Sequence, residues 1–255
     1  MEGSHEREED RGMIPRAVEQ IFEYAEKLKE LGWKYEFEAF FLEIYNESIR
    51  DLLASKELSD VAYKITHVSD QETEVSNITT VKVAHAGQVH KLLEKAARHR
   101  SVSKTEMNAR SSRSHSVFTL RISGHNSITS AKTKGVLNLI DLAGSERVNA
   151  SGVTGERLTE TKNINKSLAC LGDVISALAN GDKFIPYRNS KLTYLLQNSL
   201  GGNSKTLMFV NVSPRVEDLP ETLSSLRFAT KVNACEIGTA KKGGRVDLNS
   251  EKSEK

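Results

Sequence analysis

The chain has 255 residues, of which 38% are hydrophobic and 27% are charged, and its formal net charge is +2. This composition predicts a globular protein of one large or two small domains. No apolar run approaches the roughly 20 residues that span a bilayer, and the acidic start is not a secretory signal. Cys170 and Cys235 lie too far apart in sequence for a metal cluster, so each is expected to be a small buried hydrophobe. An acidic partner would need a local basic surface, because the net charge is nearly zero.

The apolar residues predict alternating helices and strands in the first part of the chain. Pro15 begins a helix whose apolar residues recur at helical spacing until Gly32. Residues 34–45 are rich in aromatics and partly alternate, which predicts a long strand with its aromatic side chains in the core. Ser48 is expected to cap a short helix that runs through Leu53. The next expected elements are strands near residues 62–67 and 75–83 and a helix over residues 88–100.

The stretch V-L-N-L-I-D-L-A-G-S-E at residues 136–146 contains a short apolar strand that ends in an Asp. Its Val, Leu and Ile residues are typical of a strand buried on both faces. Asp141 ends this strand, where open α/β sheets bind ligands, and an Asp there can hold magnesium or its water. Gly144 has no Cβ, so its backbone N–H can approach a terminal phosphate. A buried strand whose Asp merely caps the next turn explains the same residues.

A second polar stretch, N-A-R-S-S-R-S-H, occupies residues 108–115 and precedes an alternating strand over residues 116–122. Its hydroxyl groups and arginines suit a site for a metal and a phosphate, although a solvated serine-rich linker is the alternative. Residues 123–134 are expected to form a hairpin turn whose second strand delivers Asp141. The two loops would then lie near one end of the sheet, with Arg113 and Glu146 as opposite charges between them.

The second half of the chain continues with helices and cationic residues. A long helix is expected over residues 156–179, and residues 207–212 are expected to form a buried strand. Pro220 begins the last helix, in which Leu223, Leu226 and Phe228 are the expected packing residues. Cationic side chains follow the 136–146 stretch in a helix, a loop and a helix: Lys162, Lys166, Lys183, Arg188 and Lys191.

The two polar loops resemble the switch I and switch II loops of kinesin motor domains. Agreement continues through E-T-K-N-I-N-K-S-L at 160–168, I-P-Y-R-N-S-K-L-T at 185–193 and S-L-G-G-N-S-K-T at 199–206. The ending L-R-F-A-T-K-V-N resembles the carboxy-terminal-motor, minus-end-directed kinesins. The resemblance implies an α/β, P-loop NTPase-like motor fold with a central mixed sheet and helices on both faces. Residues 1–242 would be a partial motor domain and residues 243–255 a disordered tail.

The resemblance also assigns roles around a Mg-ATP cofactor. Ser111 and Ser112 would contact the γ-phosphate and magnesium, and Asn108 would support their loop. Asp141 would orient a magnesium-bound water, and Gly144 would sense the γ-phosphate. A further implied contact is a salt bridge that closes around the attacking water, formed by Arg113 and Glu146.

The partner implied by the resemblance is the microtubule, and Arg188 and Lys191 match the family's tubulin-facing motif. Lys162 and Lys166 are expected to join them because clustered cations attract an acidic surface, although a solvated helix face explains each lysine equally well. A dimer through an upstream coiled coil is expected, without a nucleic-acid or membrane partner. The expected location is the cytoplasm, on cytoskeletal microtubules that include the spindle.

One family motif has no counterpart in this sequence. No residues match the P-loop pattern G-x-x-x-x-G-K-[ST], and Gly is nowhere followed by Lys. Met1 falls where the family has the methionine of its T-x-T-M run, so we expect a fragment that lacks the P-loop, the first strands and the neck. An ATP-dependent motor and a non-catalytic microtubule-binding module both remain open. A GTPase-like switch is disfavoured, because there is no N-K-x-D segment.

Overall fold

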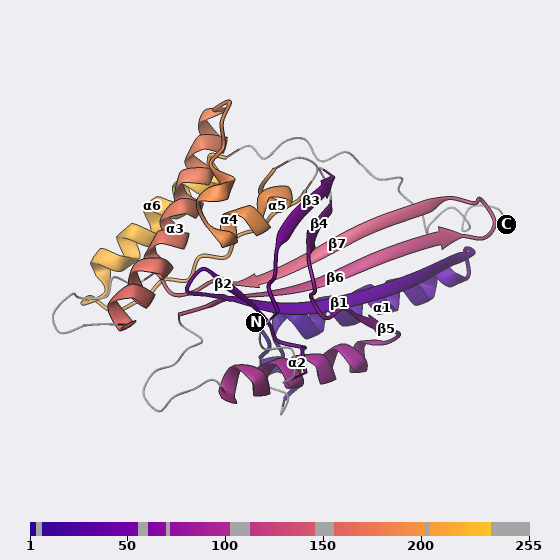
Figure 1. Cartoon of the computed structure of the whole chain (residues 1–255). Helices are drawn as coiled ribbons and strands as arrows, with labels where there is room; N and C mark the ends of the chain where they lie inside the picture. The colour runs from indigo at the N-terminus through magenta and orange to yellow at the C-terminus, as the bar shows by residue number, and fades with distance from the viewer. Residues whose placement is uncertain are drawn as a thin grey trace.

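A twisted sheet forms the centre of the molecule (Figure 1). The computed structural model describes residues 1–3, 7–55, 61–69, 72–102, 113–145, 156–201 and 204–235. The strand order is β2-β1-β6-β7, and β5 pairs with the edge of β1 that also carries β2; a separate hairpin joins β3 to β4. All of these pairs are antiparallel. The strands are β1 (Trp33–Tyr45), β2 (Ser48–Asp51), β3 (Ile65–Ser69), β4 (Glu72–Val75), β5 (Val81–Val83), β6 (His115–Asn126) and β7 (Lys132–Asp141).

Helices α1 (Met13–Lys29) and α2 (Ala86–Val102) cover one face of the sheet (Figure 1). The expected helix around Pro15 is confirmed, since α1 begins at Met13. Proline is tolerated in the first helical turn because it lacks the N–H that this turn leaves unpaired. The chain leaves α1 at Gly32, whose φ of 81° is left-handed. The core on this face joins Val18 of α1 and Val89 of α2 to the aromatic rings of Phe41 and Phe118.

The other face carries the remaining helices: α3 (Glu156–Asn180), α4 (Lys191–Leu195), α5 (Gln197–Leu200) and α6 (Leu219–Asn233). A second core joins Leu42 and Val117 of the sheet to Val174 of α3 and Leu192 of α4. The α/β class with helices on both faces is therefore confirmed, as is the long helix expected over residues 156–179. Among the described helices, none is long and apolar enough to cross a membrane.

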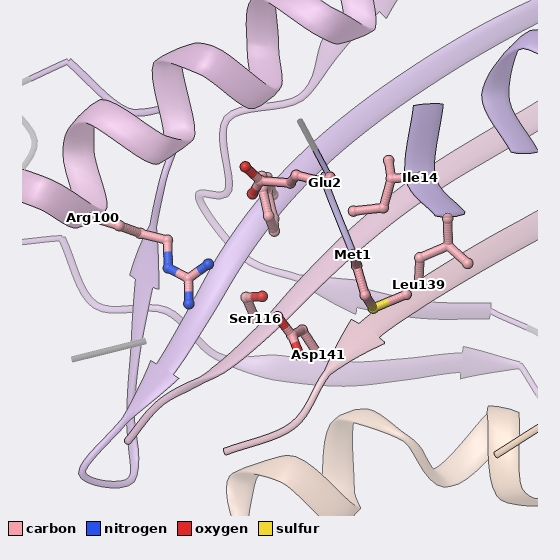
Figure 2. A pocket seen from close by; sticks show the side chains of 9 residues that line it. Met1, Glu2, Ile14, Arg100, Ser116, Leu139 and Asp141 are labelled. Carbon is pink, nitrogen blue, oxygen red and sulfur yellow. The ribbon is translucent and has the colours of Figure 1, made fainter. Parts of the chain in front are cut away.

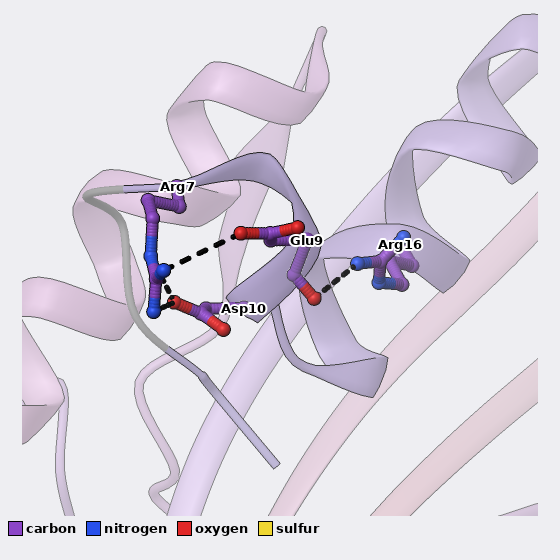
Figure 3. Close-up of polar contacts among 4 residues, drawn as sticks. All are labelled: Arg7, Glu9, Asp10 and Arg16. Atoms are coloured by element: carbon purple, nitrogen blue, oxygen red, sulfur yellow. Dashed lines mark hydrogen bonds and ion pairs between the residues drawn. The ribbon is translucent and has the colours of Figure 1, made fainter.

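The amino-terminal segment folds back on the start of α1 through a 3-10 turn, η1 (Glu8–Asp10) (Figure 3). Arg7 pairs with Asp10 at 2.7 Å and lies 3.4 Å from Glu9. The guanidinium of Arg16 donates to the Glu9 carbonyl at 3.0 Å. The Gly12 and Ile14 amides then donate to the carbonyls of residues 2 and 1, at 3.0 and 3.2 Å. These bonds hold the first residues beside the sheet.

Ser48 begins a strand and not the expected short helix. Asn46 and Glu47 have φ values of 52° and 57°, so they form the tight turn between β1 and β2. Left-handed residues at both turn positions match the twist of a two-residue hairpin, and Asn tolerates them better than most residues. Asp51 then accepts hydrogen bonds from the next backbone amides. The turn chemistry therefore overrides the helical spacing.

The strands near residues 62–83 and the hairpin before Asp141 also differ from the expectations. The segment expected as one strand over residues 75–83 divides near Asn77, whose φ is 59°, so β4 pairs with β3 while β5 pairs with β1. The expected turn over residues 123–134 is much shorter. The Asn126 side chain accepts hydrogen bonds from the amides of Ile128 and Thr129, which lets β6 and β7 pair almost to their ends.

Two apolar stretches are less buried than their sequences predict. β7 is an edge strand among the described residues, and Val136 is 49% exposed, so burial on both faces is wrong for this strand. Residues 207–212 form no strand, and Phe209 is 61% exposed. An apolar run is buried only where a second layer covers it, and no described element covers these two.

Helix α6 and the cysteines give a mixed result. Leu223 and Leu226 are exposed, contrary to expectation, whereas Phe228 packs over Gly172 of α3 as predicted. Cys170 is buried as expected, and Cys235 is half-buried. Burial raises the pKa of both thiols. The expected tail over residues 243–255 lies outside the described residues.

Candidate functional site

A cavity of about 210 Å³ opens at the carboxyl end of β7. Asp141 lies there opposite Ser116 of β6, as the register of the two strands requires. Met1 and Glu2 line the same cavity, and Figure 2 shows the Arg100 guanidinium of α2 directed toward Ser116 and Asp141. The predicted strand-end carboxylate thus faces a polar space that also contains a hydroxyl group and a fixed cation.

The loop after β7 is tied to the rest of the site by a histidine. The Ala143 amide, next to Gly144, donates to Nδ1 of His115 at 3.0 Å. The other ring nitrogen of His115 lies 2.8 Å from Oγ of Ser167 on α3. His115 is only 3% exposed, and burial lowers its pKa to about 4. One neutral ring therefore connects β6, the Gly144 loop and α3.

A buried carboxylate contacts both α2 and the residue directly before β6. Glu43 of β1 is 2% exposed and accepts a hydrogen bond from Oγ of Ser114 at 2.6 Å. Nε of Arg100, near the end of α2, lies 3.9 Å from the same carboxylate oxygen. Glu43 therefore holds the end of α2 beside the residue that precedes β6.

Sequence reasoning missed Glu43 and Arg100, and it gave His115 no role. A signal was present for Glu43, because a carboxylate inside the run F-F-L-E-I must be paired if that strand is buried. Arg100 and His115 carry no comparable signal, since a basic residue near the end of a helix and a histidine at the start of a strand are common features.

The predicted site residues are only partly described. Asp141 and Gly144 lie at the cavity end of β7, and Arg113 is half-buried directly before Ser114. The expected ion pair between Arg113 and its partner in the second loop stays a prediction. The remaining predicted residues lie outside the described part of the chain: Asn108, Ser111, Ser112 and Glu146.

The cationic residues lie on the α3 and α4 side of the molecule. Lys166, Arg188 and Lys191 are exposed, whereas the side chain of Lys162 lies outside the described residues. The guanidinium of Arg188 stands 5.8 Å from the centre of the Tyr194 ring, a cation–π distance. This contact joins Arg188 to α4, while all three cations face solvent.

The β3–β4 hairpin and the β1–β2 turn brace this surface. The rings of His67 and Tyr194 are nearly perpendicular with their centroids 4.6 Å apart, and burial lowers the pKa of this histidine. Glu47 of the turn accepts a hydrogen bond from the Lys191 amide at 2.9 Å. The β1–β2 turn, directly before Ser48, thus contacts the beginning of α4.

The donor set fits one side of a magnesium nucleotide. A carboxylate suits a magnesium-bound water, and a guanidinium with neighbouring hydroxyl groups suits a phosphate. The lysine and glycine amides of a P-loop are not supplied, because the sequence has no G-x-x-x-x-G-K-[ST] run. The described residues therefore fit the metal-facing side of such a site.

The helix-covered sheet with a strand-end carboxylate belongs to the α/β class of ligand-binding folds. The family model described as the kinesin motor domain matches residues 1–235. The chain therefore belongs to the kinesin motor domain family, and the resemblance seen in its two polar loops is confirmed.

The known proteins that this chain resembles in sequence and structure are also kinesins. The chain is 59% identical over 241 residues to Kinesin-related protein 2 of Dictyostelium discoideum, covering 91% of this chain and 30% of that protein. It is 57% identical over 244 residues to Carboxy-terminal kinesin 2 of Xenopus laevis, covering 94% and 38%. A solved KIF14 dimer in complex with a microtubule and AMP-PNP has a TM-score of 0.80 at 40% identity, covering 92% and 68%. The chain spans about a third of the length of these two curated relatives.

Proposed function

We propose that this chain provides the switch loops and microtubule-binding elements of an ATP-dependent microtubule motor. The observation that carries the proposal is the connection from the Asp141 cavity, through the Gly144 loop and His115, to helix α3. Ordering of a loop by a phosphate, when that loop is joined to a helix, is a recognised way to turn hydrolysis into movement. The family membership supports the same role.

Bound Mg-ATP would supply the bond that is hydrolysed, and the residues of this chain would position it. Asp141 would hold a magnesium-bound water, and Ser112 would bind the magnesium. Ser111 would contact the γ-phosphate, and Asn108 would support the loop that carries both serines. The backbone of Gly144 would approach the γ-phosphate. Arg113 and Glu146 would close around the attacking water, which excludes bulk solvent at the moment of reaction.

The microtubule surface is proposed for the exposed cations Lys166, Arg188 and Lys191, together with Lys162. Clustered cations attract an acidic surface at short range, so added salt is expected to weaken binding. The KIF14 dimer solved on a microtubule supports this role. We further propose minus-end-directed movement, a coiled-coil dimer and a location on cytoskeletal and spindle microtubules, because the ending L-R-F-A-T-K-V-N resembles the carboxy-terminal-motor kinesins.

Microtubule cosedimentation of the 255-residue chain tests the proposal. The chain is expected to pellet with microtubules, and Lys191→Ala should weaken binding about threefold to tenfold, as losing one favourable charge contact does. Lys29→Ala, on the opposite face of the sheet, is the matched control and should bind normally. An equal loss in both variants would contradict the proposed surface.

The effect of nucleotide on microtubule binding distinguishes a motor from a non-catalytic binding module. Binding should be tighter with AMP-PNP than with ADP if the Asp141 cavity takes nucleotide, and Asp141→Asn should remove the difference. Binding that ignores nucleotide would support the non-catalytic module instead. Reading the gene upstream of the Met1 codon adds an independent check: an in-frame P-loop is expected, and stop codons there would contradict ATP-driven movement.

A further inference from the structure

His115 occupies a buried position between the nucleotide side and the helix side of the molecule. It begins β6 and pairs with Ile44 of β1, so its backbone belongs to the most buried part of the sheet. Its ring reaches Ala143 at 3.0 Å and Ser167 at 2.8 Å. His115 is not among the described residues that line the cavity, so its contacts serve neighbouring elements and not a ligand.

The hydrogen bonds determine where the proton of the ring lies. A backbone N–H can only donate, so Nδ1 of His115 must accept the bond from Ala143. The proton of the neutral ring is therefore on Nε2, which donates to Oγ of Ser167. The lowered pKa agrees with this assignment, because a protonated ring would lose the acceptor that Ala143 requires.

The two hydrogen-bond partners of His115 lie on different parts of the molecule. Ala143 lies between Asp141 and Gly144, so any movement of this loop displaces the amide that His115 accepts. Ser167 lies on α3 next to the exposed Lys166. An imidazole is rigid, so it cannot keep both hydrogen bonds if the loop shifts while α3 stays in place.

We propose that His115 is the positioning residue that couples the loop carrying Gly144 to helix α3. The inference rests on the proposed function in one respect, namely that this loop responds to phosphate. His115 would act by keeping the loop and the helix in one matched arrangement, so that a change in the loop is passed to α3 through the ring. Among the described residues that line the cavity, His115 does not occur.

Amide hydrogen exchange at Ala143 measures the coupling without nucleotide or microtubules. In the described contacts Ser167 reaches Ala143 through the ring of His115. Ser167→Ala should therefore speed exchange at Ala143 about threefold to tenfold, the effect of weakening one hydrogen bond. Ser176→Ala, at another serine of α3, is the matched control and should leave the rate unchanged. An unchanged rate in Ser167→Ala would overturn the proposal.

A double-mutant cycle tests whether the effect passes through the ring. His115→Asn keeps a side chain that can donate and accept, and in that background Ser167→Ala should no longer change the exchange of Ala143. An effect of the same size in both backgrounds would overturn the proposal, because the coupling would then bypass His115. His125→Asn, at the exposed end of the same strand, is the control for the histidine substitution.

The ring itself supplies a further measurement that needs no substitution. Long-range proton–nitrogen NMR of the 255-residue chain should show the proton of His115 on Nε2 at neutral pH. A proton on Nδ1 would overturn the proposal, since Ala143 could not then donate. This result holds even if the His115→Asn variant fails to fold.

The functional consequence is measured separately by microtubule binding. Ser167→Ala should reduce the ratio of affinities in AMP-PNP and ADP by about threefold or more, on the same hydrogen-bond scale. If the parent chain shows no such ratio, the proposed function fails while the exchange and tautomer results still decide the coupling. If the parent responds and Ser167→Ala responds equally, the coupling proposal fails alone.

Discussion

Strands β6 and β7 have similar apolar sequences but very different burial. Val117, Phe118 and Leu120 of β6 are 2%, 1% and 0% exposed, whereas Val136 of β7 is 49% exposed. The difference follows from their neighbours, because β6 lies between β1 and β7 while β7 has one described partner. A local pattern can therefore predict a strand, but its burial depends on which other segments of the protein lie beside it.

The largest expected difference in the free energy of unfolding is between alanine substitutions of two phenylalanines, one in β6 and one in the 207–212 segment. Phe118→Ala should lower the free energy of unfolding by about 3 to 5 kcal/mol, because it removes a fully buried ring and leaves a cavity. Phe209→Ala should change it by less than about 0.5 kcal/mol, as is usual for exposed positions. Urea unfolding followed by the fluorescence of the only tryptophan, Trp33, measures both.

The same titration tests the overall stability expected from an open sheet edge and exposed apolar surface. A low midpoint for the parent chain is expected, and the midpoint of Phe118→Ala should lie well below it, close to zero urea. Equal losses in the two variants would contradict the contrast between the strands, because they would mean that Phe209 is buried in solution.

Most of the fold could be predicted from hydrophobic periodicity. A long apolar pattern with either helical or strand spacing, but not both, is present in helices α1, α2 and α3 and in strands β1 and β6. The errors lie where a short signal competes with a longer one. Asn46 and Glu47 form a hairpin turn within a segment that also reads as a helix start. Val136 and Phe209 are apolar enough for a core, but nothing local to them specifies a covering layer.

The two histidines of β6 extend the contrast from the middle of the strand to its ends. An unfolded histidine titrates near 6.5, whereas the pKa of buried His115 is about 4. Between these values the unfolded chain binds a proton that the folded chain excludes, so acid favours unfolding. The contribution is intact above pH 6.5 and is lost as the pH falls to 4, a change of about 3 kcal/mol.

Urea unfolding at a series of pH values measures this contribution. Carboxylates titrate in the same range, so the informative quantity is the difference between the parent and His115→Asn, which should shrink as the pH falls from 6.5 to 4. His125→Asn, on the exposed end of β6, should run parallel to the parent. A constant difference between the parent and His115→Asn would mean that His115 is accessible to protons in the folded state.

Two glutamates of β1, one buried and one exposed, should differ less in their effect on the free energy of unfolding. Glu43→Gln should lower the free energy of unfolding by about 2 kcal/mol, because a buried carboxylate loses its charge-assisted bond from Ser114 and its pairing with Arg100. Glu36→Gln removes an exposed carboxylate that lies 3.9 Å from Lys82, and should cost less than about 0.5 kcal/mol. Similar costs in urea unfolding would show that Glu43 is hydrated.

The candidate site was predictable where its chemistry is carried by single residues, and less so where it depends on contacts between distant parts of the chain. Asp141 and Gly144 are visible as a strand end followed by a glycine. Glu43 and Arg100 meet only because the fold brings the ends of β1 and α2 together. His115 needs both the β6–β7 register and the position of α3, which no local pattern contains.

The smallest expected effect on unfolding is at the open edge itself. Val136→Lys replaces a side chain that is already 49% exposed, so the free energy of unfolding should change by less than about 0.5 kcal/mol. Self-association should nevertheless fall, because a lysine on an edge strand prevents another edge from pairing with it. Sedimentation velocity at increasing protein concentration measures this, with Lys132→Arg as the charge-conserving control on the same strand. If the parent chain stays monomeric at every concentration, the edge of β7 is covered in solution, and the contrast with β6 is smaller than the structure indicates.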